Sequence, residues 1–80
     1  MISILNGKNI LITGCARGIG KSMVEVCAYH GANIWANARN QDNKFEDYCN
    51  LISKNFNVDV NPVYFDLTNK EQIIETVKAI

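Results

Sequence analysis

The stretch Thr13–Gly14–Cys15–Ala16–Arg17–Gly18–Ile19–Gly20 decides the fold of this 80-residue chain. It follows an apolar run over residues 9–13 and precedes a segment, residues 21–30, in which apolar side chains recur at helical spacing. A helix N-terminus offers free backbone N–H groups and the positive end of its dipole to an anion. Glycines let the backbone approach a phosphate, and the last one lets the helix lie against the strand. The stretch therefore predicts a strand, a phosphate-binding turn and a helix.

Two further strands are predicted downstream. One covers Ile34–Ala36 and ends near Arg39, and the other covers residues 58–65. The apolar run over residues 9–13 is continuous rather than alternating, which is typical of a parallel strand covered on both faces, and we expect the strand that contains Trp35 to be covered in the same way. Pro62 fits an edge strand or the start of a strand, because proline donates no ladder hydrogen bond.

Helices are predicted between and after these strands. Residues 21–30 form the first, which should end at Gly31, a residue suited to a helix C-terminus. Residues 41–56 form the second, with one apolar stripe made of Phe45, Cys49, Ile52 and Phe56. A Thr68–Glu71 capping box should open the third, which runs to Ile80 without a stop signal.

The resulting order of elements is β-α-β-α-β-α with short connections. Such alternation predicts an α/β fold with a parallel sheet and right-handed crossovers. We expect three strands in the order 3-2-1, with helices on both faces and residues 14–20 at the carboxyl edge of the sheet. This arrangement is half of a doubly wound fold.

Composition excludes several classes of protein. Eight basic residues balance eight acidic ones, which argues against a surface built for nucleic acid or an anionic membrane. No run approaches the roughly 18 apolar residues that a membrane span requires. The three cysteines match no zinc or redox motif, and no secretory signal precedes them, so we expect reduced thiols and a cytoplasmic protein without a metal site.

Residues 13–20 resemble the T-G-x-x-x-G-I-G signature of the short-chain dehydrogenase/reductase family. Residues 7–12, Gly-Lys-Asn-Ile-Leu-Ile, resemble the opening of its bacterial 3-oxoacyl-acyl-carrier-protein reductase-like members. Gly31–Ala32 and Asp66–Leu67–Thr68 continue the resemblance, which covers the whole chain, although Cys15 stands where alanine or glycine is common. The resemblance implies a Rossmann-type fold. Residues 1–80 would be the N-terminal part of a single NAD(P)-binding domain that stops within the helix after the third strand.

The resemblance also implies a nicotinamide cofactor. Ala38 occupies the position where members that prefer NAD carry aspartate, and Arg39 follows where members that prefer NADP place a basic residue. Arg17 is a second guanidinium that the family directs at the same 2′-phosphate. NADP is therefore favoured over NAD. The implied cofactor-binding residues are Gly14, Arg17, Gly18, Ile19, Gly20, Arg39, Asp66 and Leu67.

Asp66 has two interpretations. In the family, the carboxylate at the end of the third strand accepts a hydrogen bond from the adenine amino group, and the next residue's backbone contacts the ring. Alternatively, Asp66 is an ordinary aspartate between a strand end and a helix start. The surrounding motif favours the cofactor role.

None of the family's catalytic residues is found in the sequence. The catalytic base is a tyrosine followed four positions later by lysine, but Asn33, Ile52 and Thr68 stand at that distance after the three tyrosines. We therefore expect no catalytic residue and no activity from these 80 residues alone. A full-length parent would use NADPH to reduce a small carbonyl substrate, or run the reverse reaction, and would form a homo-oligomer.

Two alternatives belong to other classes. The first is a non-catalytic nucleotide-binding module or a vestigial fragment. The second is an extended sugar-nucleotide epimerase, but that group spaces its glycines as G-x-x-G-x-x-G, which Gly14, Gly18 and Gly20 do not match.

Overall fold

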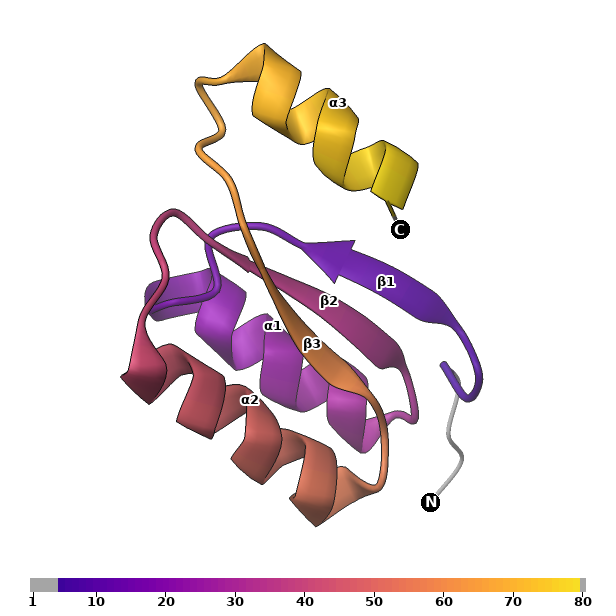
Figure 1. Cartoon of the computed structure of the whole chain (residues 1–80). Coiled ribbons are helices and arrows are strands. Elements are labelled where there is room, and N and C mark those ends of the chain that lie inside the picture. Colours follow the sequence, from indigo (N-terminus) through magenta and orange to yellow (C-terminus); the bar gives the residue numbers. More distant parts are fainter. Residues whose placement is uncertain (1–4, 80) are drawn as a thin grey trace.

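The computed structural model describes residues 5–79. The elements follow the order β1 (Asn9–Ile12), α1 (Gly18–Tyr29), β2 (Asn33–Ala38), α2 (Asn43–Phe56), β3 (Val60–Tyr64) and α3 (Lys70–Ala79) (Figure 1). Within that part of the chain the three strands form one parallel sheet in the order β1-β2-β3. The predicted α/β class, strand order and parallel pairing are confirmed.

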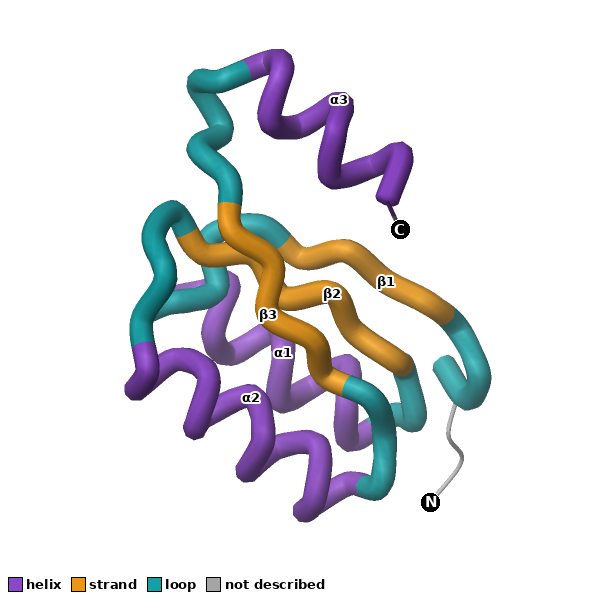
Figure 2. The backbone as a smooth tube through the Cα atoms, in the orientation of Figure 1, coloured by secondary structure: helices purple, strands orange, loops and turns teal. Residues whose placement is uncertain are grey.

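The elements form layers around the sheet. Helices α1 and α2 lie side by side on one face, and α3 lies on the other side of the sheet (Figure 2). The core lies between the sheet and the first two helices, where strand residues such as Ile34, Ala36 and Val60 meet Val24, Ala28 and Ile52.

The second face of the sheet is less covered than the sequence predicts. Burial alternates along β1, and Leu11 remains 39% exposed. Trp35, the partner of Leu11 in the ladder, is only half-buried. Within residues 5–79 the expectation that Leu11 and Trp35 are covered on both faces of the sheet is therefore wrong. The prediction of helices on both sides of the sheet is confirmed, because α3 lies opposite α1 and α2 (Figure 2).

Helix α1 ends as its sequence predicts. Gly31 has a φ of +89°, its N–H donates to the carbonyl of Ala28 at 3.0 Å, and the N–H of Ala32 donates to Cys27 at 3.0 Å. Both bonds satisfy carbonyls that the helix end would otherwise leave free. The start differs from the prediction, since α1 begins at Gly18 rather than at Lys21. The last glycines of the turn thus belong to the first helical turn.

Helix α2 begins two residues later than predicted. Asp42 is its N-cap, and its carboxylate accepts a hydrogen bond from the Lys44 N–H at 2.9 Å. Most of the predicted apolar stripe is buried, as in the case of Phe45 and Cys49. Phe56 is the exception, because it is 38% exposed and stacks on Tyr29, with 6.0 Å between the ring centroids.

The predicted capping box of α3 is wrong. The helix begins at Lys70, and the Oδ1 atom of Asn69 accepts a hydrogen bond from the Gln72 N–H at 3.1 Å. Thr68 does not cap the helix, because its N–H and hydroxyl both donate to Asp66 Oδ1, at 2.9 and 2.8 Å. The predicted end at Ile80 lies outside the described residues.

The remaining boundaries differ by a few residues. Strand β2 is longer than the predicted Ile34–Ala36, and β3 is shorter than the predicted residues 58–65. Pro62 lies within β3, which forms an edge of the sheet in the part of the chain described. No helix among these residues is long and apolar enough to cross a membrane.

Candidate functional site

The glycine turn lies at the carboxyl end of β1 and leads directly into α1 (Figure 1). Gly14 and Gly18 have φ values of +62° and +67°, and a Cβ at either position would have no neighbour within 4 Å. The backbone is therefore open to an approaching ligand at both positions. At Gly20 a Cβ would lie 2.9 Å from the Thr13 carbonyl oxygen and closer still to the Gly14 carbonyl. Gly20 is thus required by packing within the protein.

Hydrogen bonds to the backbone and side chain of Asn37 hold the turn in place. The Cys15 N–H donates to the Asn37 carbonyl at 2.7 Å, and the Gly14 N–H donates to Asn37 Oδ1 at 3.1 Å. The Cys15 thiol contacts the Ile12 carbonyl oxygen at 3.0 Å. Burial raises the pKa of this thiol to about 11, so Cys15 remains protonated at neutral pH. It acts as a packed, uncharged residue beneath the turn.

Arg17 and Arg39 line the same cavity, of about 440 Å³, beside the turn. Ala38, Asn40 and Asp42 belong to its wall as well. Residue 38 on this wall is alanine and so offers no carboxylate to the cavity. Asp42 does line the cavity, although the sequence did not predict it as a site residue. That carboxylate is hydrogen-bonded at the start of α2.

Arg39 and Asp66 are in direct contact. The Arg39 Nη2 atom lies 3.2 Å from Asp66 Oδ2, with the two side chains 76% and 28% exposed. Hydrogen bonds from Thr68, and secondarily the Arg39 guanidinium, lower the pKa of the Asp66 carboxyl. An exposed ion pair of this kind contributes little to stability. The Arg39 guanidinium can therefore leave Asp66 for another anion at little cost.

The other predicted residues surround the same edge. Ile19 is 84% exposed and Leu67 is 56% exposed, so neither belongs to the core of the described residues. The structure thus brings the glycine turn, both arginines and the Asp66–Leu67 segment to the carboxyl edge of one sheet, as expected for ligands in open α/β sheets.

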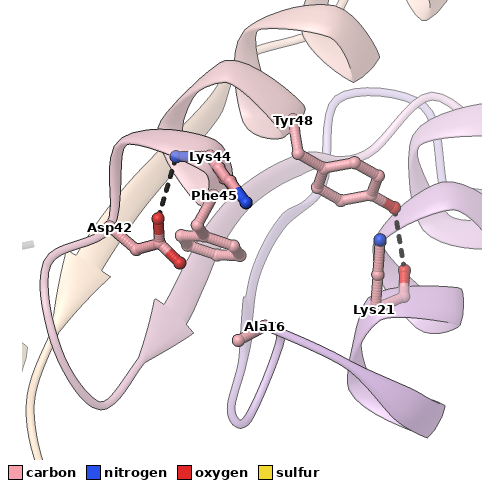
Figure 3. A pocket seen from close by; sticks show the side chains of 6 residues that line it. All are labelled: Ala16, Lys21, Asp42, Lys44, Phe45 and Tyr48. Atoms are coloured by element: carbon pink, nitrogen blue, oxygen red, sulfur yellow. Dashed lines mark hydrogen bonds between the residues drawn. The ribbon is translucent and has the colours of Figure 1, made fainter.

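A second, smaller cavity of about 250 Å³ lies between the turn and α2 (Figure 3). Lys21 Nζ lies 4.7 Å from the centroid of the Tyr48 ring, and the Tyr48 hydroxyl lies 2.9 Å from Glu25 Oε1. Burial and the Glu25 carboxylate raise the pKa of Tyr48. A tyrosine base needs the opposite shift, so Tyr48 is unsuited to that role. Among the residues described, no cluster of His, Cys, Asp and Glu could hold a metal ion.

Comparisons with known proteins agree with this geometry. Residues 8–80 match the family model of the short chain dehydrogenases. The chain therefore belongs to the short-chain dehydrogenase family. An oxidoreductase of Botryotinia fuckeliana is 35% identical over 68 residues, which are 85% of this chain and 23% of the relative. Gluconate 5-dehydrogenase of Gluconobacter oxydans is 29% identical over 95% of this chain and 29% of the relative.

Solved structures show the same fold. L-sorbose reductase from Gluconobacter frateurii, complexed with NADPH and L-sorbose, has a TM-score of 0.86 and 30% identity over 99% of this chain and 30% of that protein. The NADPH-dependent 3-quinuclidinone reductase from Rhodotorula rubra has a TM-score of 0.88 and 27% identity over 98% of this chain and 29% of that protein. The predicted Rossmann-type architecture is confirmed. The chain spans less than a third of the length of the relatives described here.

Proposed function

We propose that the chain is the nicotinamide-cofactor-binding part of an oxidoreductase that interconverts a carbonyl and an alcohol with NADP(H). The observation that carries the proposal is the cavity that Arg17 and Arg39 both line beside an open glycine turn. Two guanidinium groups beside a helix N-terminus match the charge of a phosphorylated dinucleotide. The relatives that use NADPH by name support the same choice.

Each part of the site has a proposed role. The turn from Gly14 through Gly18 and Ile19 to Gly20 would hold the pyrophosphate, and Arg17 and Arg39 would hold the 2′-phosphate. Asp66 would accept a hydrogen bond from the adenine amino group, and the Leu67 backbone would contact the adenine ring. The cofactor supplies the hydride when bound, while the protein orients it. We propose a small carbonyl or alcohol as the substrate, with a 3-oxoacyl thioester as one class to test.

We expect the chain to bind NADPH about tenfold more tightly than NADH, since a charge-assisted hydrogen bond contributes about 1.5 kcal/mol or more and tenfold corresponds to about 1.4 kcal/mol. Isothermal titration calorimetry on the 80-residue chain measures both constants. Titrations with 2′,5′-ADP and 5′-AMP isolate the contribution of the 2′-phosphate. Equal affinities within each pair would contradict the assignment of Arg17 and Arg39.

We also expect no NADPH oxidation by the 80-residue chain with any carbonyl. The sequence offers no Tyr-x-x-x-Lys pair, and the raised pKa of Tyr48 makes it a weaker proton donor for carbonyl reduction. Absorbance at the nicotinamide band, recorded over a panel of ketones, ketoses and acyl thioesters, tests this expectation. Any turnover by the unmodified chain would contradict this expectation, and the same turnover in a Tyr48→Phe variant would show that a group other than Tyr48 supplies the proton.

The alternative function is a non-catalytic nucleotide-binding module, since the open glycine turn and the cavity beside it would bind a nucleotide without any catalytic group. The two proposals differ in a longer reading frame that contains this chain. Carbonyl reduction by that protein supports the oxidoreductase, whereas NADPH binding without turnover of any carbonyl supports the module.

A further inference from the structure

Asn37 is the one polar or charged residue among residues 5–79 that is fully buried, with 2% of its surface exposed. It lies near the carboxyl end of the central strand β2, between the ends of β1 and β3. The Oδ1 atom of its side chain accepts a hydrogen bond from the Gly14 N–H at 3.1 Å. The Nδ2 atom donates to the carbonyls of Phe65 and Ala38, each at 3.1 Å.

The Asn37 side chain thus links Gly14 to Phe65, and both of these residues lie at the candidate site. Gly14 opens the glycine turn, and its neighbour Cys15 is held by the Asn37 backbone carbonyl. On the other side, Phe65 directly precedes Asp66, and the Phe65 N–H donates to Ala38 at 3.2 Å. The pyrophosphate side and the adenine side of the site are therefore joined through one amide.

Asparagine is chemically suited to this position. Its amide provides an acceptor and two donors, whereas an ionised aspartate only accepts and an aliphatic side chain does neither. Replacement by an apolar residue would leave the Gly14 N–H and the Phe65 carbonyl without this partner. Buried polar groups without partners are unfavourable, so both segments would shift toward other partners or water.

We propose that Asn37 is a positioning residue that sets the spacing between the glycine turn and the Asp66 segment and so pre-organises the cofactor site. The inference rests on the proposed function, since it assigns both segments to one ligand. Pre-organisation increases affinity by removing the ordering that binding would otherwise require. Asn37 itself need not touch the cofactor.

Asn33 provides a matched control on the same strand. Its Oδ1 atom accepts a hydrogen bond from the Asp59 N–H at 3.0 Å, so it also links β2 to the β3 region through an amide. Asn33 is the first residue of β2 and Asn37 is the residue before its last, so the two hydrogen-bonded links lie at opposite ends of that strand. Asn33→Ala therefore removes an inter-strand amide contact away from the candidate site.

The experiment compares Asn37→Ala, the milder Asn37→Ser and Asn33→Ala with the unmodified chain. Calorimetry gives the dissociation constant for NADPH, and NMR hydrogen exchange gives the protection of individual amides. In Asn37→Ala we expect about tenfold weaker binding, equivalent to about 1.4 kcal/mol, and faster exchange at both Gly14 and Phe65. Asn37→Ser should show the same changes to a smaller extent. Asn33→Ala should accelerate exchange at Asp59 alone and leave NADPH binding unchanged.

NADPH affinity tests the proposed function, and hydrogen exchange tests whether Asn37 couples Gly14 to Phe65. If the unmodified chain does not bind NADPH, the proposed function fails, while the exchange rates at Gly14 and Phe65 still test the coupling. Unchanged NADPH affinity in a folded Asn37 variant would overturn the positioning role. The role is also overturned if exchange accelerates at Gly14 but not at Phe65, or if Asn33→Ala weakens NADPH binding equally.

Discussion

Gly20→Ala is expected to abolish NADPH binding and to destabilise the fold, whereas Gly18→Ala should abolish binding with a smaller loss of stability. The difference follows from what a methyl group would meet. At Gly20 the methyl group would meet backbone atoms of Thr13 and Gly14, and these cannot move away by changing rotamer as a side chain can. The start of α1 must then move away from β1. Overpacking of this kind costs about 3 kcal/mol at its upper range.

Gly18→Ala acts through a different mechanism. Open space surrounds that position, so the cost to the free protein is the left-handed backbone alone, about 1 kcal/mol. The new methyl group would occupy space proposed for the pyrophosphate. Binding should therefore fall much more than stability does.

Thermal unfolding and NADPH calorimetry on both variants measure these effects. Gly7→Ala is the matched control, because Gly7 also has a positive φ, +77°, and open surroundings, but it precedes β1 and lies outside the candidate site. It should lose about as much stability as Gly18→Ala and bind NADPH normally. Normal binding by Gly18→Ala would remove the turn from the site, and an unchanged melting temperature for Gly20→Ala would contradict the close contact between α1 and β1.

The fold was predictable because its signals are local. A glycine pattern between an apolar run and a helical stripe needs no distant information, and neither does Gly31 at the end of α1. Alternation of strands and helices then limits the sheet to a few topologies. The start of α3 was not predictable in this way. Thr68 and Asn69 are both good N-cap residues, and the choice depends on Asp66, which engages the Thr68 hydroxyl.

The candidate site was predictable in its members but not in their contacts. Family resemblance identified Arg39 and Asp66 separately, yet their ion pair depends on how the ends of β2 and β3 align, with Ala38 opposite Tyr64. Asn37 was missed because its partners, Gly14 and Phe65, are 23 and 28 residues away in the sequence. A polar residue within an apolar strand run was the available signal.

Arg39→Asp should shift the ratio of NADPH to NADH affinity toward NADH by about 100-fold, since each tenfold factor corresponds to about 1.4 kcal/mol and a charge-assisted hydrogen bond contributes about 1.5–3 kcal/mol. The variant loses a guanidinium and places a carboxylate in the cavity beside Arg17. That carboxylate repels a 2′-phosphate and accepts a hydrogen bond from the 2′-hydroxyl of NADH. Both changes act in the same direction.

The ion pair with Asp66 adds to this expectation. In the free protein Arg39 contacts Asp66 Oδ2 at 3.2 Å, so a bound 2′-phosphate has to share or replace that carboxylate. NADH has no 2′-phosphate that could replace Asp66 as the partner of Arg39. Removing the guanidinium frees Asp66 for adenine at no loss to NADH, whereas NADPH loses its cation. The gain for NADH and the loss for NADPH are therefore separable by measuring each constant.

Two control variants distinguish the local effect from a change in net charge. Arg39→Gln removes the cation without adding an acid, so NADPH affinity should weaken about tenfold, or about 1.4 kcal/mol, while NADH affinity should gain only what the release of Asp66 contributes. Lys54→Asp makes the same charge change as Arg39→Asp, but in the last turn of α2, and should leave the ratio as it is. Calorimetric constants for both cofactors at two salt concentrations complete the test, because distant charges are screened by salt and a contact is screened less. An unchanged ratio in Arg39→Asp would exclude Arg39 from the site, and an equal shift in Lys54→Asp would attribute the preference to overall charge.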